Sequence, residues 1–157
     1  MKICLVRPPI VVPAANLVVT YTPPVGLAYV AGALREAQFE LCFIDGLGES
    51  LDTRHNWVKD CYICGLTLEQ VVDRIPDDAD MIGIHAGFSF DWPMCKVLIK
   101  LIRERFPNIT LIGGGEHVSA VPEASLLESS LDIIVCGEGE ETAVEVARAV
   151  ENENTNF

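Results

Sequence analysis

Four short turns rich in glycine, proline or polar residues could together form the rim of a ligand-binding site. Each turn follows an apolar run, at residues 3–6, 80–84, 109–112 and 132–136. The turns are Arg7-Pro8-Pro9, His85-Ala86-Gly87-Phe88-Ser89, Gly113-Gly114-Gly115-Glu116-His117 and Gly137-Glu138-Gly139-Glu140-Glu141. If the runs are parallel strands of an open α/β sheet, all four turns lie at its carboxyl edge, where ligands bind. We therefore expect a bound cofactor at this edge.

The spacing of the glycines argues against two common nucleotide sites. A dinucleotide fingerprint needs G-x-G-x-x-G/A in the first strand-to-helix turn, whereas Gly137-x-Gly139 meets Thr142 at its last position and follows the fifth run. A P-loop ends in Gly-Lys-Ser/Thr, and neither glycine turn contains that ending. The three consecutive glycines at 113–115 lack Cβ atoms, so they permit a large flat or extended ligand to press against bare backbone.

The composition indicates one compact domain and excludes some partners. The chain has 157 residues, of which 50% are hydrophobic, enough for one core but not for two domains. A formal net charge of -12 argues against nucleic-acid binding, which needs a basic surface. No apolar run reaches the roughly 18–20 residues of a membrane span, so we expect no membrane contact and a cytoplasmic location. The six cysteines, with Cys4, Cys42 and Cys136 in expected strands, are interpreted as reduced and buried.

The hydrophobic pattern predicts five strands and five helices in alternation. The strands are expected at residues 2–6, 40–44, 80–84, 109–112 and 132–136, and the helices at 25–38, 67–75, 93–106, from about 122, and 141–150. Thr67-x-x-Gln70 fits a capping box at the start of the second helix. Gly26, Ala28, Gly32 and Ala33 would let the first helix lie close to the sheet. The stretches 8–24 and 46–65 are expected to be long irregular loops, either functional or disordered.

This alternation predicts an α/β fold: a flavodoxin-like, doubly wound, parallel five-stranded sheet with helices on both faces. Right-handed crossovers leave few topologies, and we expect the strand order 2-1-3-4-5. The topological switch point then lies between the first and third strands. The turns Arg7–Pro9 and His85–Ser89 would flank the binding crevice there, and the two glycine turns would extend it.

Three segments in order resemble the N-terminal cobalamin-binding domain of radical S-adenosylmethionine enzymes. They are Pro23-Pro24-x-Gly26-Leu27-x-Tyr29-x-Ala31, Gly113-Gly114-Gly115-Glu116-His117 and Gly137-Glu138-Gly139-Glu140, and the resemblance covers nearly the whole chain. Related domains of methyltransferases and mutases carry Asp-x-His-x-x-Gly after the second strand, whose histidine ligates cobalt. Here Asp45 is present, but Leu47 and Ser50 stand at the histidine and glycine positions. The resemblance therefore implies cobalamin bound without that histidine.

The resemblance also implies which residues contact the cofactor. The corrin would lie across the carboxyl ends of the strands, and the nucleotide tail would run between sheet and helices beside Gly113 and Gly114. His85 stands near the position of a serine that meets the tail in related domains, and Ser89 is the alternative source of a hydroxyl group. Gly137 and Glu138 could bond the tail or the corrin amides. The full expected set is Arg7, Pro8, Pro9, Asp45, Gly46, His85, Ala86, Gly87, Phe88, Ser89, Gly113, Gly114, Gly115, Glu116, His117, Gly137, Glu138 and Gly139.

Several of these residues have an equally ordinary structural interpretation. His85 either holds the rim through hydrogen bonds or contacts the cofactor. His117 either fixes the turn after Gly115 or lies at the cofactor. The glutamates after Gly137 could simply favour the positive amino end of the last helix. Arg7 pairs either with corrin amides or with a neighbouring acid.

Cys61-x-x-Cys64, with His55 nearby, is the other metal-like pattern. Structural zinc normally needs four ligands, and this motif supplies two. We interpret the pair as two ordinary cysteines in a variable loop, with zinc or a redox dithiol as the alternative.

A radical S-adenosylmethionine enzyme needs a Cys-x-x-x-Cys-x-x-Cys motif for its iron–sulfur cluster, and this sequence lacks one. We therefore expect a cobalamin-binding domain at residues 1–152 and, at 153–157, a tail that leads to an absent catalytic domain. The parent enzyme, expected to be a methyltransferase, would bind the [4Fe-4S] cluster and S-adenosylmethionine, and the isolated domain would not turn over substrate. The alternatives are an interaction domain that has lost cobalamin binding and, less favoured, a free-standing enzyme.

Overall fold

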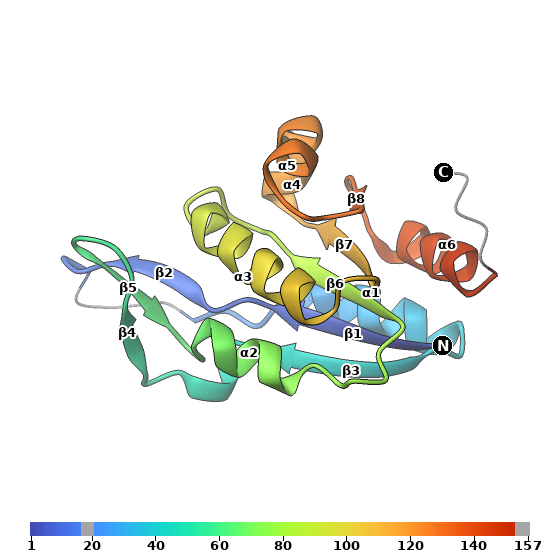
Figure 1. Cartoon of the computed structure of the whole chain (residues 1–157), viewed down its shortest axis with the longest axis horizontal. Coiled ribbons are helices and arrows are strands. Elements are labelled where there is room, and N and C mark those ends of the chain that lie inside the picture. Colours follow the sequence, from blue (N-terminus) through green and yellow to red (C-terminus); the bar gives the residue numbers. More distant parts are fainter. Residues whose placement is uncertain (17–20, 153–157) are drawn as a thin grey trace.

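The computed structural model describes residues 1–16 and 21–152 and contains a five-stranded parallel sheet (Figure 1). Its strands are β1 (Lys2–Arg7), β3 (Glu40–Asp45), β6 (Met81–His85), β7 (Thr110–Gly114) and β8 (Ile133–Val135). They are ordered β3-β1-β6-β7-β8, and every neighbouring pair is parallel. Numbered along the chain, this is the predicted order 2-1-3-4-5, so the flavodoxin-like fold is confirmed. Each strand lies within one or two residues of its predicted bounds.

Helices cover both faces of this sheet. One face carries α1 (Val25–Glu36) and α6 (Glu140–Glu151), and the other carries α2 (Leu68–Arg74) and α3 (Trp92–Arg105). Side chains alternate between the faces along each strand, as the two-residue period of a strand requires. Leu5 and Met81 pack with α1 and α6, whereas Cys4 and Ile82 pack in the cluster that contains α2 and α3. Both faces are therefore buried, which explains why the strands are continuously apolar.

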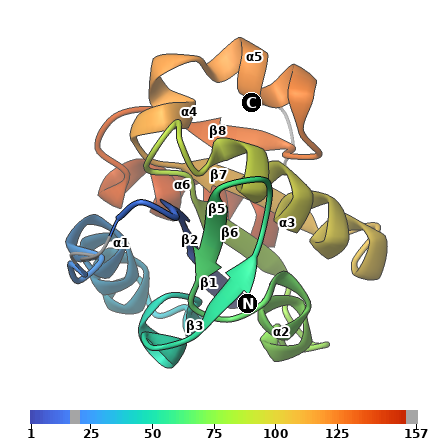
Figure 2. The same cartoon turned by 90° about the vertical axis from the view of Figure 1, so that its left-hand side faces the viewer.

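A second, antiparallel sheet occupies the two stretches that we predicted to be irregular, so that prediction was wrong. It has the order β2-β5-β4, with β2 at Ile10–Pro13, β5 at Cys61–Cys64 and β4 at Arg54–Asn56. A single 3-10 turn, η1 (Gly48–Ser50), precedes β4. The small sheet lies beyond the carboxyl ends of the main strands, and Figure 2 looks at it from that end. β2 pairs with β5 across about 50 positions of sequence, whereas β4 and β5 pair locally, and strands of three or four residues are too short to show a clear period. Residues 17–20 of the predicted 8–24 loop are outside the described part of the chain.

Six α-helices occur in the described residues, one more than predicted. The extra helix, α4 (Glu116–Ala120), begins directly after Gly115 and is followed by α5 (Pro122–Glu128). The predicted capping box is confirmed, because the Gln70 backbone N–H donates to Thr67 Oγ1 and the Thr67 N–H donates to Gln70 Oε1.

Of the four small residues of α1 that were predicted to lie close to the sheet, Gly26 is on the sheet side, but Ala28, Gly32 and Ala33 are not. The helix presents larger side chains to the core, with Leu27 and Leu34 fully buried and Val30 packed beside them. Ala28, Gly32 and Ala33 line a shallow groove on the outer side of the helix instead. The apolar residues of the helix set its orientation against the sheet, and Ala28, Gly32 and Ala33 are left on the outer side.

The expectation that the cysteines are buried is partly corrected. Cys4 is buried in β1, but Cys136 lies just after β8 and is exposed. All six cysteines are free. Within residues 1–16 and 21–152, no helix combines the length and the apolar character that crossing a membrane requires.

Candidate functional site

An apolar cavity of about 160 Å³ lies between the main sheet and helices α1 and α6. We call it the inner cavity. The sheet contributes side chains from four strands, among them Leu5, Met81, Ile112 and Val135. Helix α1 contributes Leu27, Val30 and Leu34, and α6 contributes Ala143. The glycine turn at 137–139 also lines the cavity.

Missing side chains create much of this cavity. Gly114, at the end of β7, lines it, and a Cβ atom built there would meet nothing within 4 Å. The same holds for Gly26 at the start of α1 and for Gly137, whose φ of 74° also favours glycine. Gly83 lines the cavity from β6, beside Leu5. Glycine at positions 26, 114 and 137 therefore leaves open space where any other residue would place a side chain, whereas at Gly83 a Cβ atom would lie 2.9 Å from Cδ2 of Leu5.

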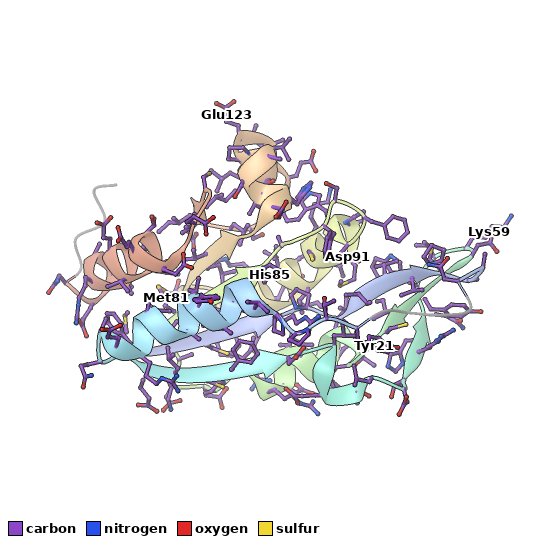
Figure 3. All side chains as sticks on the ribbon, turned by 180° about the vertical axis from the view of Figure 1, so that it is seen from behind. Tyr21, Lys59, Met81, His85, Asp91 and Glu123 are labelled. Carbon is purple, nitrogen blue, oxygen red and sulfur yellow. The ribbon has the colours of Figure 1, made fainter. Side chains whose placement is uncertain are left out.

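His85 stands where the inner cavity meets the edge of the sheet. It is the last residue of β6, pairs in register with Gly114 of β7, and lines the cavity (Figure 3). The ring lies against Gly87, where a Cβ atom would be only 2.8 Å from Nε2. Burial lowers the pKa of His85, and the charge of Arg7 lowers it further. The imidazole is therefore neutral near pH 7 and has one nitrogen that donates and one that accepts.

A second hollow of about 390 Å³ opens at the carboxyl ends of β1 and β6, and we call it the rim pocket. Its polar groups are Arg7, His85, Asp91 and Glu116, and its apolar walls include Pro8, Pro9 and Phe88. The rim pocket shares Gly26, Leu27 and His85 with the inner cavity. It lies at the predicted switch point between β1 and β6, which are neighbours in the sheet.

Arg7 bridges three parts of this rim. Its Nη1 lies 3.2 Å from Oδ2 of Asp45, and its Nη2 donates to the Thr22 carbonyl at 2.7 Å. Asp45 also accepts a hydrogen bond from the Gly48 N–H, which forms the turn after β3. The structure thus shows Arg7 paired with a neighbouring acid, which is one of the two alternatives that the sequence left open. Both side chains are partly buried, so the pair fixes the loop before α1 against the end of β3.

The turn after β7 is held by contacts with the turn after β6. Gly115 has φ 119°, and a Cβ atom there would lie 2.8 Å from the Ala86 carbonyl oxygen. That carbonyl accepts a hydrogen bond from the His117 N–H, and the Ala86 N–H donates to the Gly114 carbonyl. Nδ1 of His117 lies 2.8 Å from Oγ of Ser89, and its ring packs on Trp92. Gly115, Ala86, Ser89 and His117 thus hold two rim turns together.

The structure brings most of the expected site residues to the two hollows. The inner cavity is lined by six of them: His85, Gly114, Gly115, Gly137, Glu138 and Gly139. The rim pocket is lined by Arg7, Pro8, Pro9, His85, Gly87, Phe88 and Glu116. The remaining residues, which line neither hollow, are Asp45, Gly46, Ala86, Ser89, Gly113 and His117.

Gly113 and Gly46 are close-packing positions. Gly113 faces the other side of the sheet from Gly114, and a Cβ atom on it would lie 2.6 Å from Cδ1 of Leu131. Gly46 packs on the turn after β1, and a Cβ atom on it would lie 2.8 Å from the Arg7 carbonyl oxygen. Their lack of a side chain lets segments approach, and it opens no space for a ligand.

Sequence reasoning missed most of the cavity wall. Met81, Gly83 and His85 stand two residues apart along β6, so the strand period could have indicated that they share a face. Asp91 and Cys95 of the rim pocket lie at the start of α3, and no motif marked them. The range of helix α1 was predicted, but its role as a cavity wall was not.

Cys61 and Cys64 lie on β5, three residues apart. Side chains at that spacing in a strand point to opposite faces, which does not suit a shared metal ion. Among the described residues, no group of three or more His, Cys, Asp or Glu side chains is placed to hold a metal. Nε2 of His55 lies 3.2 Å from the Gly65 carbonyl oxygen, so this histidine has a structural contact.

Known proteins match nearly the whole chain. It is 32% identical over 151 residues to an uncharacterized methyltransferase of Pyrococcus horikoshii. The aligned region covers 96% of this chain and 29% of that relative. It is 27% identical over 155 residues to an anaerobic magnesium-protoporphyrin IX monomethyl ester cyclase of Synechocystis, covering 98% of this chain and 28% of that protein. The chain therefore spans less than a third of the length of these relatives.

A solved structure shares the fold. The radical S-adenosylmethionine methyltransferase TsrM from Kitasatospora setae, with tryptophan substrate and a SAM analog bound, aligns with a TM-score of 0.71 at 21% identity. The alignment covers 99% of this chain and 26% of that one.

A family model described as the B12 binding domain matches residues 12–147. The match includes three of the four rim turns, all of α1 and residues 140–147 of α6, the two helices that wall the inner cavity. The resemblance to a cobalamin-binding domain, inferred from the residues, is thereby confirmed. The chain belongs to the B12-binding domain family.

Proposed function

We propose that this chain binds cobalamin and serves as the cofactor domain of a radical S-adenosylmethionine enzyme, most simply a methyltransferase. One observation carries the proposal: an apolar cavity inside the domain shares His85, Gly26 and Leu27 with a pocket at the rim. A cofactor with a flat macrocycle and an aromatic tail needs both an edge and an internal cavity of this kind.

The described residues fit such a group. A Cβ atom at Gly114 would stand in open space, so the cavity beside β7 exists because the residue is glycine. An apolar cavity of about 150 Å³ is large enough to take an aromatic ring, and the inner cavity measures about 160 Å³. The rim pocket adds amide-binding groups, including Arg7 and Glu116, at the edge of the sheet.

Particular residues would hold the two parts of the cofactor. The tail would lie along Gly114, Gly137 and the wall of α1, and the turns Arg7–Pro9 and His85–Ser89 would support the corrin. When bound, cobalamin supplies a cobalt centre that accepts and transfers a methyl group. The protein contributes burial of the tail and a neutral, partly buried His85 at the junction of the two hollows.

We further propose that cobalt has no histidine ligand from this chain. Leu47 stands where related domains place that histidine, and it is 1% exposed. It packs with Val12 and Cys64 of the small sheet, away from both hollows. The position at which related domains carry the cobalt-ligating histidine is therefore part of an apolar interface between the loop after β3 and the small sheet.

The parent protein is also a proposal. The relatives are three to four times longer than this chain, and one is a methyltransferase by name. We propose that residues 1–152 form the cobalamin domain and that 153–157, which lie outside the described residues, lead to a catalytic domain. That domain would bind S-adenosylmethionine and a [4Fe-4S] cluster. The free cysteines support a cytoplasmic location.

Binding is tested by a visible-absorption titration of the purified protein with hydroxocobalamin and methylcobalamin, with equilibrium dialysis to count bound cofactor. We expect saturable one-to-one binding and a base-off spectrum, because the tail is then withdrawn from cobalt. Absence of binding to both forms would overturn the proposal and favour an interaction domain that keeps only the fold.

A further inference from the structure

The side of α1 that is turned away from the sheet carries exposed apolar side chains, and we call it the outer face. Figure 3 looks onto this side of the molecule, with α1 in front of the sheet. Tyr29 is 65% exposed and Val25, one helical turn before it, is 58% exposed. The residues of the outer face, at intervals of one, three or four positions, are Val25, Ala28, Tyr29, Gly32, Ala33 and Glu36. An apolar patch of this kind on a protein surface is typical of an interaction site.

The outer face continues to the edge of the main sheet. β3 is an edge strand, and its residues Leu41 and Phe43 line a second groove together with Pro24 and Ala28. Phe43 is 41% exposed. Pro24 and Ala28 line both grooves, so the apolar surface runs without a break from α1 to the edge strand.

The glycine at position 32 is not required by packing within the described chain. A Cβ atom built on Gly32 would meet nothing within 4 Å. Glycine inside a helix is also less favourable than alanine, because its backbone loses more freedom on folding. A hollow on an exposed helix face does, however, let a second helix approach closely. Gly32 therefore indicates contact with another surface.

The outer face is complementary to itself in shape. If two copies of α1 pack antiparallel about a twofold axis between residues 30 and 31, Tyr29 of each copy faces Gly32 of the other. In the same arrangement Ala28 faces Ala33. Each large ring therefore meets the hollow of the other copy, and small residues meet small residues. A twofold interface needs this kind of match, because it brings the same patch of both copies together.

The charges of the outer face follow the same symmetry. Within the described residues, the N-terminus of α1 has no side-chain cap and no acidic residue in its first turn, so its positive end is free. Glu36 lies at the opposite end of the helix, where the dipole of its own helix disfavours a carboxylate. In the antiparallel pair, Glu36 of one copy lies beside Val25 in the first turn of the other. Glu140, which also lines the groove, is in the first turn of α6 and is favoured by the dipole of that helix.

We propose that the outer face of α1 is a dimer interface, on which a second copy of this chain packs its own α1 antiparallel about a twofold axis. Tyr29 of each copy fills the hollow at Gly32 of the other. With 12 residues α1 is about 18 Å long, so the interface is small, and we expect a dissociation constant on the order of 10–100 µM. The inference does not depend on cobalamin binding, because the opposite side of α1 lines the inner cavity.

The test is sedimentation equilibrium of the purified protein without cofactor, at concentrations from about 1 µM to 1 mM, which bracket the expected dissociation constant. We expect the mass to rise from 17.1 kDa towards twice that value. Tyr29→Glu should weaken the association at least about tenfold, because it removes the central aromatic contact. Leu127→Glu is the matched control, since Leu127 lies on α5 and is 87% exposed. A mass of one chain at every concentration would overturn the proposal and leave the outer face to a different partner.

A second set of variants tests the antiparallel arrangement itself. Gly32→Leu fills the hollow and should weaken the association at least about tenfold. Its free energy of unfolding as a monomer should stay equal or rise, because leucine favours a helix more than glycine does. The exchange of Tyr29→Gly with Gly32→Tyr places the ring and the hollow in reversed order and should restore the dimer. Association of Gly32→Leu as strong as that of the wild type would refute the interface.

Discussion

Oδ1 of Asp91 accepts a hydrogen bond of 2.8 Å from the backbone N–H of Val11, 80 residues away in the sequence. Asp91 is buried at the start of α3, and Val11 lies on β2 of the small sheet. This contact joins the small sheet to the helix layer beside the rim pocket. Burial raises the pKa of the Asp91 carboxyl, and the Val11 hydrogen bond partly opposes that rise.

Replacing Asp91 separates its hydrogen bond from its charge. Asp91→Asn keeps an oxygen that can accept from Val11, whereas Asp91→Ala leaves a buried N–H without a partner. We expect the Ala variant to lose about 1–3 kcal/mol of unfolding free energy at pH 7. The Asn variant should match or exceed the wild type at that pH, because it avoids burying a charge. Urea unfolding measures both, and an equal loss in the two variants would contradict this account.

The raised pKa of Asp91 also predicts a pH dependence with a definite sign. The folded state holds the proton to higher pH than the unfolded state, whose carboxyl has a pKa near 4. Stability contributed by this group therefore falls as the pH rises from about 4 through the folded pKa. The free-energy difference between Asp91→Asn and the wild type should grow in favour of Asn over that range. A difference that is constant with pH would show that the carboxyl is not perturbed.

Two adjacent glycines allow binding and folding to be tested separately. Gly114 borders open cavity, so Gly114→Val should place a branched side chain in the tail position and abolish cobalamin uptake with a cooperative fold retained. Gly115 has φ 119° and touches the Ala86 carbonyl, so Gly115→Ala should destabilise the fold by about 1–3 kcal/mol or more. Gly32→Val on the outer side of α1 is the control for added volume. Unchanged affinity in Gly114→Val would contradict the proposed position of the tail.

The main sheet was predictable because its signals are local. Each strand is a short apolar run, each of its helices has an apolar period, and Thr67 with Gln70 marks a helix start. The small sheet was not predictable, because β2 and β5 are four-residue strands whose pairing depends on contacts about 50 residues apart. Val12 and Cys64 of these strands pack with Leu47, and Val11 and Ile63 pack in the main core, contacts that no sequence period reveals.

The rim was easier to predict than the cavity behind it. Turns such as Gly113–Gly115 stand out by composition, and the parallel sheet brings them to one edge. The cavity, in contrast, depends on which strand residues share a face and on the space left between α1 and α6. Gly113 and Gly114 illustrate the difference: adjacent in the sequence, they face opposite sides of β7, and only Gly114 lines the cavity.

Introducing the missing histidine should fail to create a cobalt ligand. Leu47 is 1% exposed among Val12 and Cys64, so Leu47→His places an imidazole in an apolar cluster. We expect a loss of about 2–4 kcal/mol of unfolding free energy and an unchanged spectrum of bound cobalamin. The loss should grow below pH 6.5, because burial lowers a histidine pKa and the unfolded chain then binds more protons. Leu47→Met should cost much less, and a histidine-ligated spectrum would contradict the prediction.

The Arg7–Asp45 pair should contribute to the stability of the fold, because it connects the loop before α1 to the end of β3. A double-mutant cycle measures the coupling free energy of the pair. Arg7→Met removes the charge and both contacts, whereas Asp45→Asn keeps an acceptor for the Gly48 N–H. The side chains of Arg7 and Asp45 are 12% and 25% exposed, so solvent screens the pair only partly. We expect a coupling free energy of about 1 kcal/mol, which decreases at high salt. Arg7→Lys should not restore it fully, because one ammonium group cannot reach Asp45 and the Thr22 carbonyl with the geometry of the guanidinium. Additive effects within about 0.3–0.5 kcal/mol would mean that the two residues act independently and that the loop before α1 is held by other contacts.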